Sequence, residues 1–328
     1  MVQNYKWISY NSRKHIPPFP PGPYGLPVVG YLPFIGSNLH ERFTEMAHRY
    51  GPIFSLRLGR KLHVVVNSMD LVKVVTRDLD QTMANRSPPL AALTISYCGN
   101  DIAWSNSNTH WRKMRKILAT QVLSNTNLKS CQSFRSDEVR KLVKLRSLHK
   151  SGDGNDSSTI GDGFGEVEIK IMKLVEAPNI SDFFPMLSKL CTVAGYTTPK
   201  GTIVYMNVWA IHRDPKNWTN PLEFKPERFL IDKWDYHGNN FKFLPFGSGR
   251  RICPGIPLGE KILMYILASL LHSFDWSLPE DEEFELSDEF GLVTKKRKPL
   301  TAIPSQRLSD AGPLNFLIED YLSIYSYC

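Results

Sequence analysis

The sequence has no apolar stretch long enough to cross a bilayer. Its longest apolar run, Ile262–Leu271, spans ten residues, whereas a transmembrane helix needs about 20. The first sixteen residues contain no continuous apolar run either. The sequence as it stands is therefore expected to carry neither a signal peptide nor a membrane anchor. The apolar run itself indicates a buried helix over Leu258–Phe274.

Cysteine is also scarce, and no charge pattern is strong. Five cysteines in 328 residues are too few for a disulfide scaffold and favour a reduced compartment. A hydrophobic content of 42% with 22% charged residues is typical of a globular chain rather than a disordered one. The net charge of +8 suits nucleic acid, an anionic membrane or an acidic protein. No expected helix combines clustered Lys and Arg with aromatics, so a nucleic-acid partner is not expected.

Proline, in contrast, is abundant and clustered. Seven of the 23 prolines lie between Pro17 and Pro33, and seven more between Pro199 and Pro257. Pro17–Pro23 predicts a stiff, extended hinge. Periodicity and turn residues predict the other elements. These are helices at Leu39–Tyr50, Ser68–Asp78, Thr109–Ala119 and Ser136–Leu148, a strand hairpin over Phe54–Leu58 and Leu62–Val66, a second hairpin over Val193–Val208 turning at Pro199-Lys200-Gly201, and a strand edge at Lys295–Lys298.

The most informative segment is Phe246-Gly-Ser-Gly-Arg-Arg-Ile-Cys-Pro-Gly255. If the segment is extended, Arg251 and Cys253 project to the same side. The cation and the helix N-terminus that follows would both stabilise a thiolate. Gly249 and Gly255 would let a large flat group approach the backbone. These are the requirements for an anionic sulfur that ligates haem iron axially.

The same segment resembles the haem-binding signature of the cytochrome P450 family at Phe246, Gly249, Arg251, Cys253 and Gly255. The resemblance implies that Cys253 is the axial ligand to the iron of haem b and that Phe246 packs near its sulfur.

Two further segments extend the resemblance. Pro226–Phe229 resembles the conserved tetrapeptide that precedes the cysteine in the family. Trp111 and Arg115 lie four residues apart, hence on one helical face. They resemble the helix pair that meets the haem propionates, with Arg251 on the other side; bidentate arginine–carboxylate geometry suits that role.

The family resemblance also implies a fold and a reaction. The expected fold is mainly α with small β-sheets, and the expected reaction is O2-dependent hydroxylation. Electrons would come from NADPH through NADPH–cytochrome P450 reductase, which would dock on a basic face. The hinge and Leu26–Gly30 resemble plant microsomal members, which implies a small lipophilic substrate of the terpenoid or phenylpropanoid/flavonoid class. Such members lie on the cytosolic face of the endoplasmic reticulum membrane; without the anchor, this chain is expected in the cytosol.

Two parts of the family pattern are missing. The family activates oxygen with an acidic residue beside a threonine on a long central helix. Ala194–Thr198 lacks the acid and runs into a turn, so no catalytic residue is identified. No glutamate is followed three residues later by arginine, so Arg228 lacks its usual network partners. The fold is therefore expected to be incomplete, and the alternative function is an inactive remnant that binds haem at most.

The order of segments predicts that a block is missing between Leu190 and Cys191, with a smaller gap near the Gly/Asp/Ser-rich linker. An altered splice form or an imperfect gene sequence would explain both. The predicted organisation is an N-terminal segment at 1–16, an N-terminal P450 part at 17–149, the linker at 150–165, a remnant preceding the central helix at 166–190, a C-terminal haem-binding part at 191–310, and a tail outside the family pattern at 311–328.

Overall fold

A computed structural model describes residues 18–148, 190–193, 195–199, 201–231, 234–280, 285–291 and 293–307, together with 167, 170–173 and 175. The predicted segments 1–16, 150–165 and 311–328, and most of 166–190, lie outside the described residues. The chain divides into two compact units. The first unit comprises Met1–Arg112, Met172–Cys253 and Phe290–Leu292; the second comprises Lys113–Ile171, Pro254–Glu289 and Val293–Cys328.

Helices are the larger part of the described secondary structure, and strands form small sheets. The helices are α2 (Leu39–Tyr50), α3 (Met69–Lys73), α4 (Asp80–Met83), α5 (Leu90–Ile95), α6 (Thr109–Ile117), α7 (Asn125–Ser130), α8 (Gln132–Leu148), α10 (Val208–Ile211) and α11 (Ile256–Ser273). Shorter helical turns are η1 (Leu32–Phe34), η2 (Val74–Asp78), η3 (Leu118–Val122), η6 (Pro226–Phe229) and η7 (Gly249–Arg251). The strands are β1 (Ile53–Leu58), β2 (Lys61–Val66), β3 (Leu190–Val193), β4 (Tyr196–Pro199), β5 (Ile203–Met206), β6 (Phe274–Ser277), β7 (Asp288–Glu289), β8 (Lys295–Lys296) and β9 (Ile303–Gln306).

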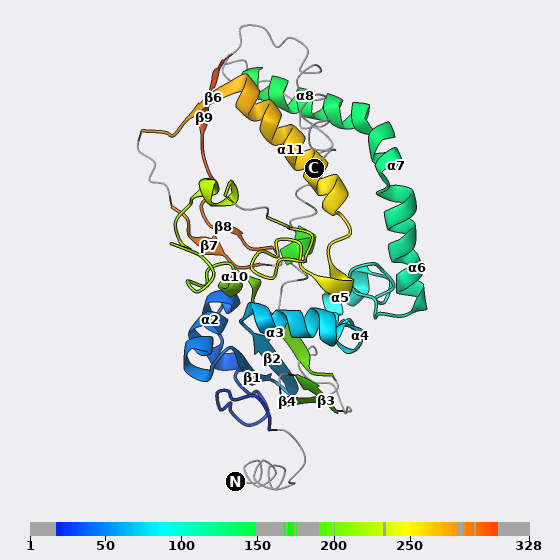
Figure 1. The fold of residues 1–328 in the computed structure, drawn as a ribbon, viewed down its shortest axis with the longest axis vertical. Coiled ribbons are helices and arrows are strands. Elements are labelled where there is room, and N and C mark those ends of the chain that lie inside the picture. The colour runs from blue at the N-terminus through cyan, green and yellow to red at the C-terminus, as the bar shows by residue number, and fades with distance from the viewer. Residues whose placement is uncertain are drawn as a thin grey trace. The chain divides into compact units, whose positions relative to one another are not determined.

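The predicted N-terminal hairpin is confirmed. β1 and β2 pair antiparallel around the Gly59-Arg60 turn, and β5 joins the free edge of β2 in parallel, with Val64 opposite Val204. Successive β2 side chains serve opposite faces of the sheet. Val64 packs in a cluster with Val72 of α3, whereas Val65 packs in a second cluster with α2. Helices therefore cover both faces (Figure 1).

The second predicted hairpin, over Val193–Val208, is wrong in its pairing. β4 pairs antiparallel with β3, not with β5. Only two residues separate Val193 from Tyr196, and the second of them, Gly195, has a φ of +78°. A two-residue loop with positive φ makes the tightest hairpin, so the reversal occurs there. β5, which follows the predicted turn, pairs with β2 and not with β4.

The proline segment is part of the first unit. The Pro20 and Pro21 carbonyls accept hydrogen bonds from Ser55 Oγ and Ser55 N, each at 2.7 Å. The Pro18 carbonyl accepts from Thr197 N at 2.9 Å. A Cβ on Gly22 would lie 1.7 Å from the Ser55 carbonyl oxygen. This approach admits only glycine, so the segment is docked closely along β1.

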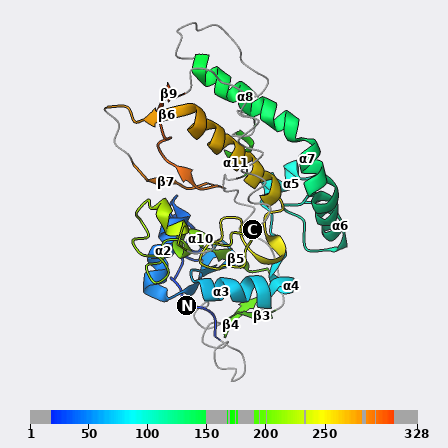
Figure 2. The same cartoon turned by 45° about the horizontal axis from the view of Figure 1, so that its top comes forward.

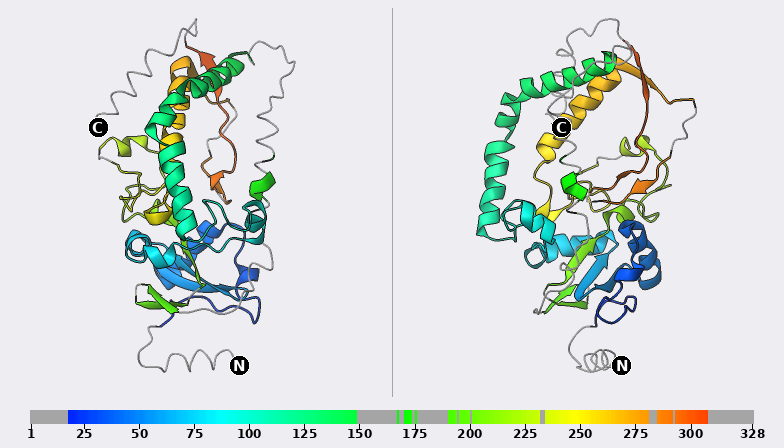
Figure 3. Two further views of the ribbon diagram at one scale, coloured as in Figure 1. Left: turned by 90° about the vertical axis from the view of Figure 1, so that its right-hand side faces the viewer. Right: turned by 180° about the vertical axis from the view of Figure 1, so that it is seen from behind.

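In the second unit, α8 and α11 lie side by side (Figures 2 and 3). Val139 of α8 and Phe274 form a small buried cluster with Tyr265, Ile266 and Leu270. The strand β6 follows α11 directly and pairs antiparallel with β9. Lys295 and Lys296 form β8, which confirms a strand within the predicted strand edge Lys295–Lys298.

The predicted burial of α11 is wrong on one face. Leu263, Met264, Leu267 and Leu271 are 63%, 46%, 50% and 52% exposed. The helix is apolar nearly all round, a pattern typical of a helix enclosed by protein. The part of the structure that is described leaves this face without a covering element. None of the described helices combines the length and apolar character needed to cross a membrane.

Candidate functional site

The cysteine loop closes on itself instead of running extended, so the predicted alternation of Arg251 and Cys253 is wrong. Gly247 and Gly249 have φ values of +74° and +67°, and this left-handed backbone turns the chain into η7. Ile252 N then donates to the Gly249 carbonyl at 3.1 Å, and Cys253 N donates to the Phe246 carbonyl at 3.0 Å. These bonds fix the backbone on both sides of Cys253, whose side chain is exposed.

Arg251 is turned toward the core of the first unit. Its Nε donates to the Ala84 carbonyl at 2.7 Å and its Nη2 to the Ser105 carbonyl. The guanidinium lies over the Trp111 ring, 4.1 Å from the ring centroid. The structure thus brings together Trp111 and Arg251, two residues that the sequence assigned to one site. The same cation is an anchor for the loop that carries Cys253.

Replacing Arg251 with alanine is expected to lower the free energy of unfolding by about 3 kcal/mol. Two charge-assisted hydrogen bonds and a cation–π contact are lost, and two carbonyls lose a donor. Equilibrium urea unfolding measures the change. Arg250→Ala is the matched control, because Arg250 pairs with Asp80 at 2.8 Å where both side chains are about 30% exposed. That pair is expected to contribute at most about 1 kcal/mol; equal losses would contradict the anchoring role of Arg251.

Trp111 is buried, and its indole N–H already donates a hydrogen bond within the protein. The Nε1–H donates to the Ile102 carbonyl at 2.9 Å, and the backbone N–H donates to Asn108 Oδ1 at 2.8 Å. A propionate could bind the indole only by displacing the Ile102 carbonyl. Arg115 follows one turn later in the last turn of α6. The propionate role of both residues stays a prediction.

Gly249 is required for packing beneath the loop. A Cβ at this position would lie 2.3 Å from the Thr76 carbonyl oxygen of η2. Gly255 differs, because it caps α11 with an ordinary φ of −83°. Phe246 contributes its carbonyl to Cys253, and its ring lies 6.3 Å from that of Tyr236. The sequence explained Gly249 by access for a flat group; the structure adds the contact with Thr76.

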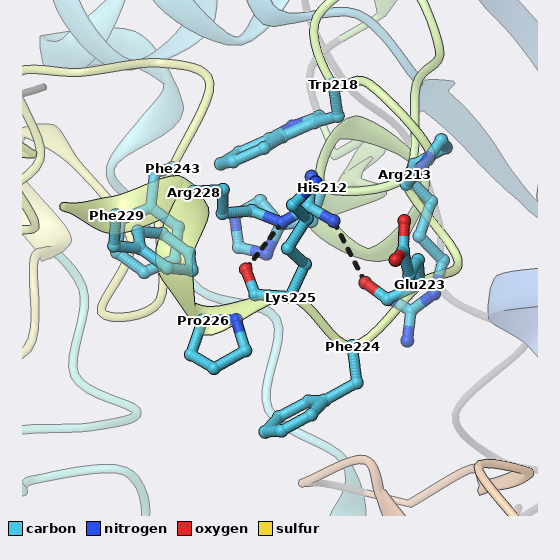
Figure 4. A pocket seen from close by; sticks show the side chains of 11 residues that line it. His212, Arg213, Trp218, Glu223, Phe224, Lys225, Pro226, Arg228, Phe229 and Phe243 are labelled. Carbon is cyan, nitrogen blue, oxygen red and sulfur yellow. Dashed lines mark hydrogen bonds between the residues drawn. The ribbon is translucent and has the colours of Figure 1, made fainter. Parts of the chain in front are cut away.

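Among the described residues, Arg228 binds backbone carbonyls in place of the network side chains that the family pattern would provide (Figure 4). Its guanidinium donates to the carbonyls of Thr219, Asn220, Glu223 and Lys225 at 2.8–3.1 Å. The arginine therefore holds residues 219–225 in one turn. This role of Arg228 could not be predicted from the sequence, because every residue type supplies a backbone carbonyl.

The same loop borders an open cavity of about 290 Å³. Trp218, Phe229 and Phe243 contribute aromatic rings to its wall (Figure 4). His212 lies beside them, and its Nε2 accepts a hydrogen bond from Leu244 N at 2.8 Å. Burial, with a smaller contribution from the Arg213 charge, lowers the pKa of His212 from 6.5 to about 4.

The neutral state of His212 predicts acid sensitivity. Because the pKa of His212 is lower in the folded chain than in the unfolded chain, acid favours unfolding. The stability that depends on neutral His212 is complete above pH 6.5 and is lost as the pH falls through 4. At pH 5 the expected loss from this residue is about 2 kcal/mol. His63, whose pKa burial also lowers to about 4, adds a similar loss. Urea unfolding at pH 7.5 and pH 5 measures how much unfolding free energy is lost on acidification. In His212→Gln this loss is expected to be about half that of the unmodified chain. His237→Gln is the control, because His237 is exposed, and this variant should lose as much stability as the unmodified chain. An equally large loss in His212→Gln would contradict the assignment of the acid sensitivity to His212.

The residues around Cys253 fit a haem held through a single sulfur ligand. Within the described ranges there is no cluster of three or more His, Cys, Asp or Glu side chains suited to a metal. Haem supplies four ring nitrogens of its own and needs one protein sulfur. Cys253 offers that sulfur as an exposed side chain on a backbone fixed by hydrogen bonds. These residues fit the thiolate side of a haem.

Comparisons with known proteins agree with this interpretation. Residues 20–171 and 183–303 match the family described as Cytochrome P450. Cytochrome P450 76C2 of Arabidopsis thaliana is 25% identical, over 90% of this chain and 93% of that protein. Geranylhydroquinone 3''-hydroxylase CYP76B74 of Arnebia euchroma is 24% identical, over 87% and 93%. A zebra fish cytochrome P450 solved with progesterone has a TM-score of 0.56 at 20% identity, over 82% of this chain and 99% of that one.

The alignment with the Arabidopsis protein also gives the size of the missing block. It spans 478 aligned positions with the Arabidopsis protein, yet 90% of this chain is only about 295 residues. Roughly 180 positions of the relative therefore have no counterpart here. The truncation inferred from the absent motifs agrees with this difference in length, while its position at Leu190–Cys191 stays a prediction. With the family match covering most of its length, the chain belongs to the cytochrome P450 family of haem-dependent monooxygenases, as a member with a large internal deletion.

Proposed function

We propose that this chain binds haem b through Cys253 and derives from an enzyme that hydroxylates a small lipophilic plant metabolite. The observation that carries the proposal is the exposed Cys253 side chain on a backbone fixed by the Phe246 carbonyl. The substrate class is terpenoid or phenylpropanoid/flavonoid. A relative named as a geranylhydroquinone hydroxylase supports it, because that name joins a terpenoid chain to a phenolic ring.

Each residue of the loop has a defined task in this proposal. Cys253 would supply the sulfur ligand of a bound haem, and the hydrogen bonds that the Phe246 and Gly249 carbonyls accept would keep the loop from collapsing over it. Arg251 fixes the loop to the carbonyls of Ala84 and Ser105. Bound haem would supply the oxygen-activating chemistry. Trp111, Arg115 and Arg251 stay the residues proposed to hold the propionates.

Electrons would come from NADPH through NADPH–cytochrome P450 reductase. The net charge of +8 suits docking of an acidic partner. By family, the expected place of action is the cytosolic face of the endoplasmic reticulum membrane.

The carbon-monoxide difference spectrum of the reduced, purified chain tests haem binding. A thiolate-type Soret band at one haem per chain is the expected result. A chain that takes up no haem, or binds it with a nitrogen-ligand spectrum, would overturn the proposal.

A second function is favoured by the deletion itself. Roughly 180 aligned positions are absent, and the acid–threonine pair is among the missing features. The look-alike residues Thr197 and Thr198 are buried in β4, not on a helix. The alternative is thus a remnant that binds haem without turnover. Product formation from geranylhydroquinone with reductase and NADPH, at a rate tied to NADPH consumption, would exclude the remnant.

A further inference from the structure

A second cavity lies in the second unit, where α8 and α11 are neighbours (Figure 3). We call it the α8–α11 cavity. Residues of α8 between 134 and 139 and residues of α11 between 261 and 266 line it. Its volume is about 300 Å³, at the lower end of the range of about 300–1,000 Å³ for small-molecule sites. Cys253 and the cavity beside Arg228 belong to the first unit, so the α8–α11 cavity is a different feature.

Most of the side chains that line this cavity are apolar. Val139 is buried, and Ile266 packs against the cluster that Val139 forms with Phe274. Phe134 and Ile262 also line the cavity, yet they are 71% and 37% exposed. The apolar lining therefore includes both core and solvent-accessible side chains. Two of its members, Phe134 and Tyr265, carry rings, and ring faces suit a flat apolar ligand.

The charged side chains that line the cavity are two cations and one carboxylate. The cations are Arg135 and Lys261, and the carboxylate is Glu138. Arg135 Nη2 donates to the Leu128 carbonyl at 2.6 Å, which fixes the guanidinium. Glu138 is already neutralised, because its carboxylate pairs with Lys141 Nζ at 2.6 Å. Among the described residues, neither Arg135 nor Lys261 forms an ion pair, so the charge that the cavity offers to a ligand is positive.

We propose that the α8–α11 cavity binds a small aryl carboxylate, whose apolar body fills the cavity and whose carboxylate pairs with Lys261. Apolar walls with a few polar groups are the usual composition of a small-molecule site. The ammonium of a lysine is a point charge on a flexible stem, so it can follow a carboxylate at the mouth of the cavity. A cationic ligand would be repelled by Lys261 and Arg135. The proposal concerns the second unit alone and does not depend on haem binding by Cys253.

Equilibrium dialysis of the full, haem-free chain against trans-cinnamate tests the site. Saturable binding of one cinnamate per chain is expected. Cinnamyl alcohol has the same body without the charge and should bind about fivefold more weakly, the effect of one partly exposed ion pair. Lys261→Gln should weaken cinnamate binding by the same factor and leave the affinity for the alcohol unchanged. Lys129→Gln is the matched control, because Lys129 of α7 is exposed and is not among the lining residues; it should change neither affinity.

A further variant, Ile262→Trp, places a larger side chain in the cavity and should abolish binding of both compounds. Binding that persists in this variant would place the ligand elsewhere and overturn the proposal. Equal affinities for cinnamate and the alcohol, or equal cinnamate affinities in Lys261→Gln and Lys129→Gln, would refute the pairing with Lys261. The absence of saturable binding would refute the site itself. If circular dichroism shows that Ile262→Trp does not fold, the comparison of the two lysine variants still decides the result.

Discussion

Replacing Cys253 with serine is expected to abolish the thiolate-type Soret band in the carbon-monoxide difference spectrum. The serine hydroxyl stays protonated at neutral pH and is a poor ligand for haem iron, whereas a thiolate binds it strongly. The fold should survive, because the Cys253 side chain is exposed and the loop is closed by backbone hydrogen bonds. Haem titration and circular dichroism of the same samples measure the two effects.

Cys131→Ser is the matched control for this prediction. Cys131 is likewise an exposed free cysteine, at the C-terminal end of α7 and far from the loop in sequence. Its replacement is expected to leave the spectrum unchanged. A thiolate band that persists in Cys253→Ser and disappears in Cys131→Ser would assign the ligand to the other cysteine and refute the proposed site.

Changing Gly249 to alanine is expected to lower the free energy of unfolding by about 3 kcal/mol or more. The new methyl group would lie 2.3 Å from the Thr76 carbonyl oxygen, a backbone atom, so η2 or η7 would have to shift. The φ of +67° adds about 1–2 kcal/mol of strain for any residue with a Cβ, and overpacking adds about 1–3 kcal/mol. Urea unfolding gives the change directly, and haem uptake should fall with it.

The Gly247→Ala variant separates the cost of backbone strain from the cost of overpacking. Gly247 has a similar φ of +74°, but no atom lies within 4 Å of the position that an added methyl group would take. Only the conformational cost of about 1–2 kcal/mol is expected. If the two substitutions cost the same, the contact with Thr76 does not constrain the loop.

Local patterns predicted the local structure well. The alternation in Phe54–Leu58 and Leu62–Val66 predicted the first hairpin, and Gly51 and Ser68 marked helix ends that the structure confirms. These elements are decided by residues that are close in sequence. The family itself was predictable for a similar reason, since the cysteine signature is ten adjacent residues.

The errors concern contacts between distant residues. Nothing near β5 in sequence shows that its partner is β2, about 140 residues earlier. Gly249 of η7 packs closely against Thr76, a contact between distant residues that no local window contains. Arg228 binds carbonyls, and every residue type supplies those. The apolar character of α11 was predicted correctly, but whether a helix is covered depends on the rest of the chain.

The parallel pairing of β2 with β5 also sets the order of assembly during synthesis. His63 lies opposite Ile203, so about 140 residues must be translated before the open edge of β2 acquires its neighbour. At roughly 5–20 residues per second this takes on the order of ten seconds. Until then the hairpin presents unpaired N–H and C=O groups, a template for pairing with other nascent chains. Completion of the first unit, including the attachment of Arg251 to Ala84 and Ser105, awaits the second half of the polypeptide.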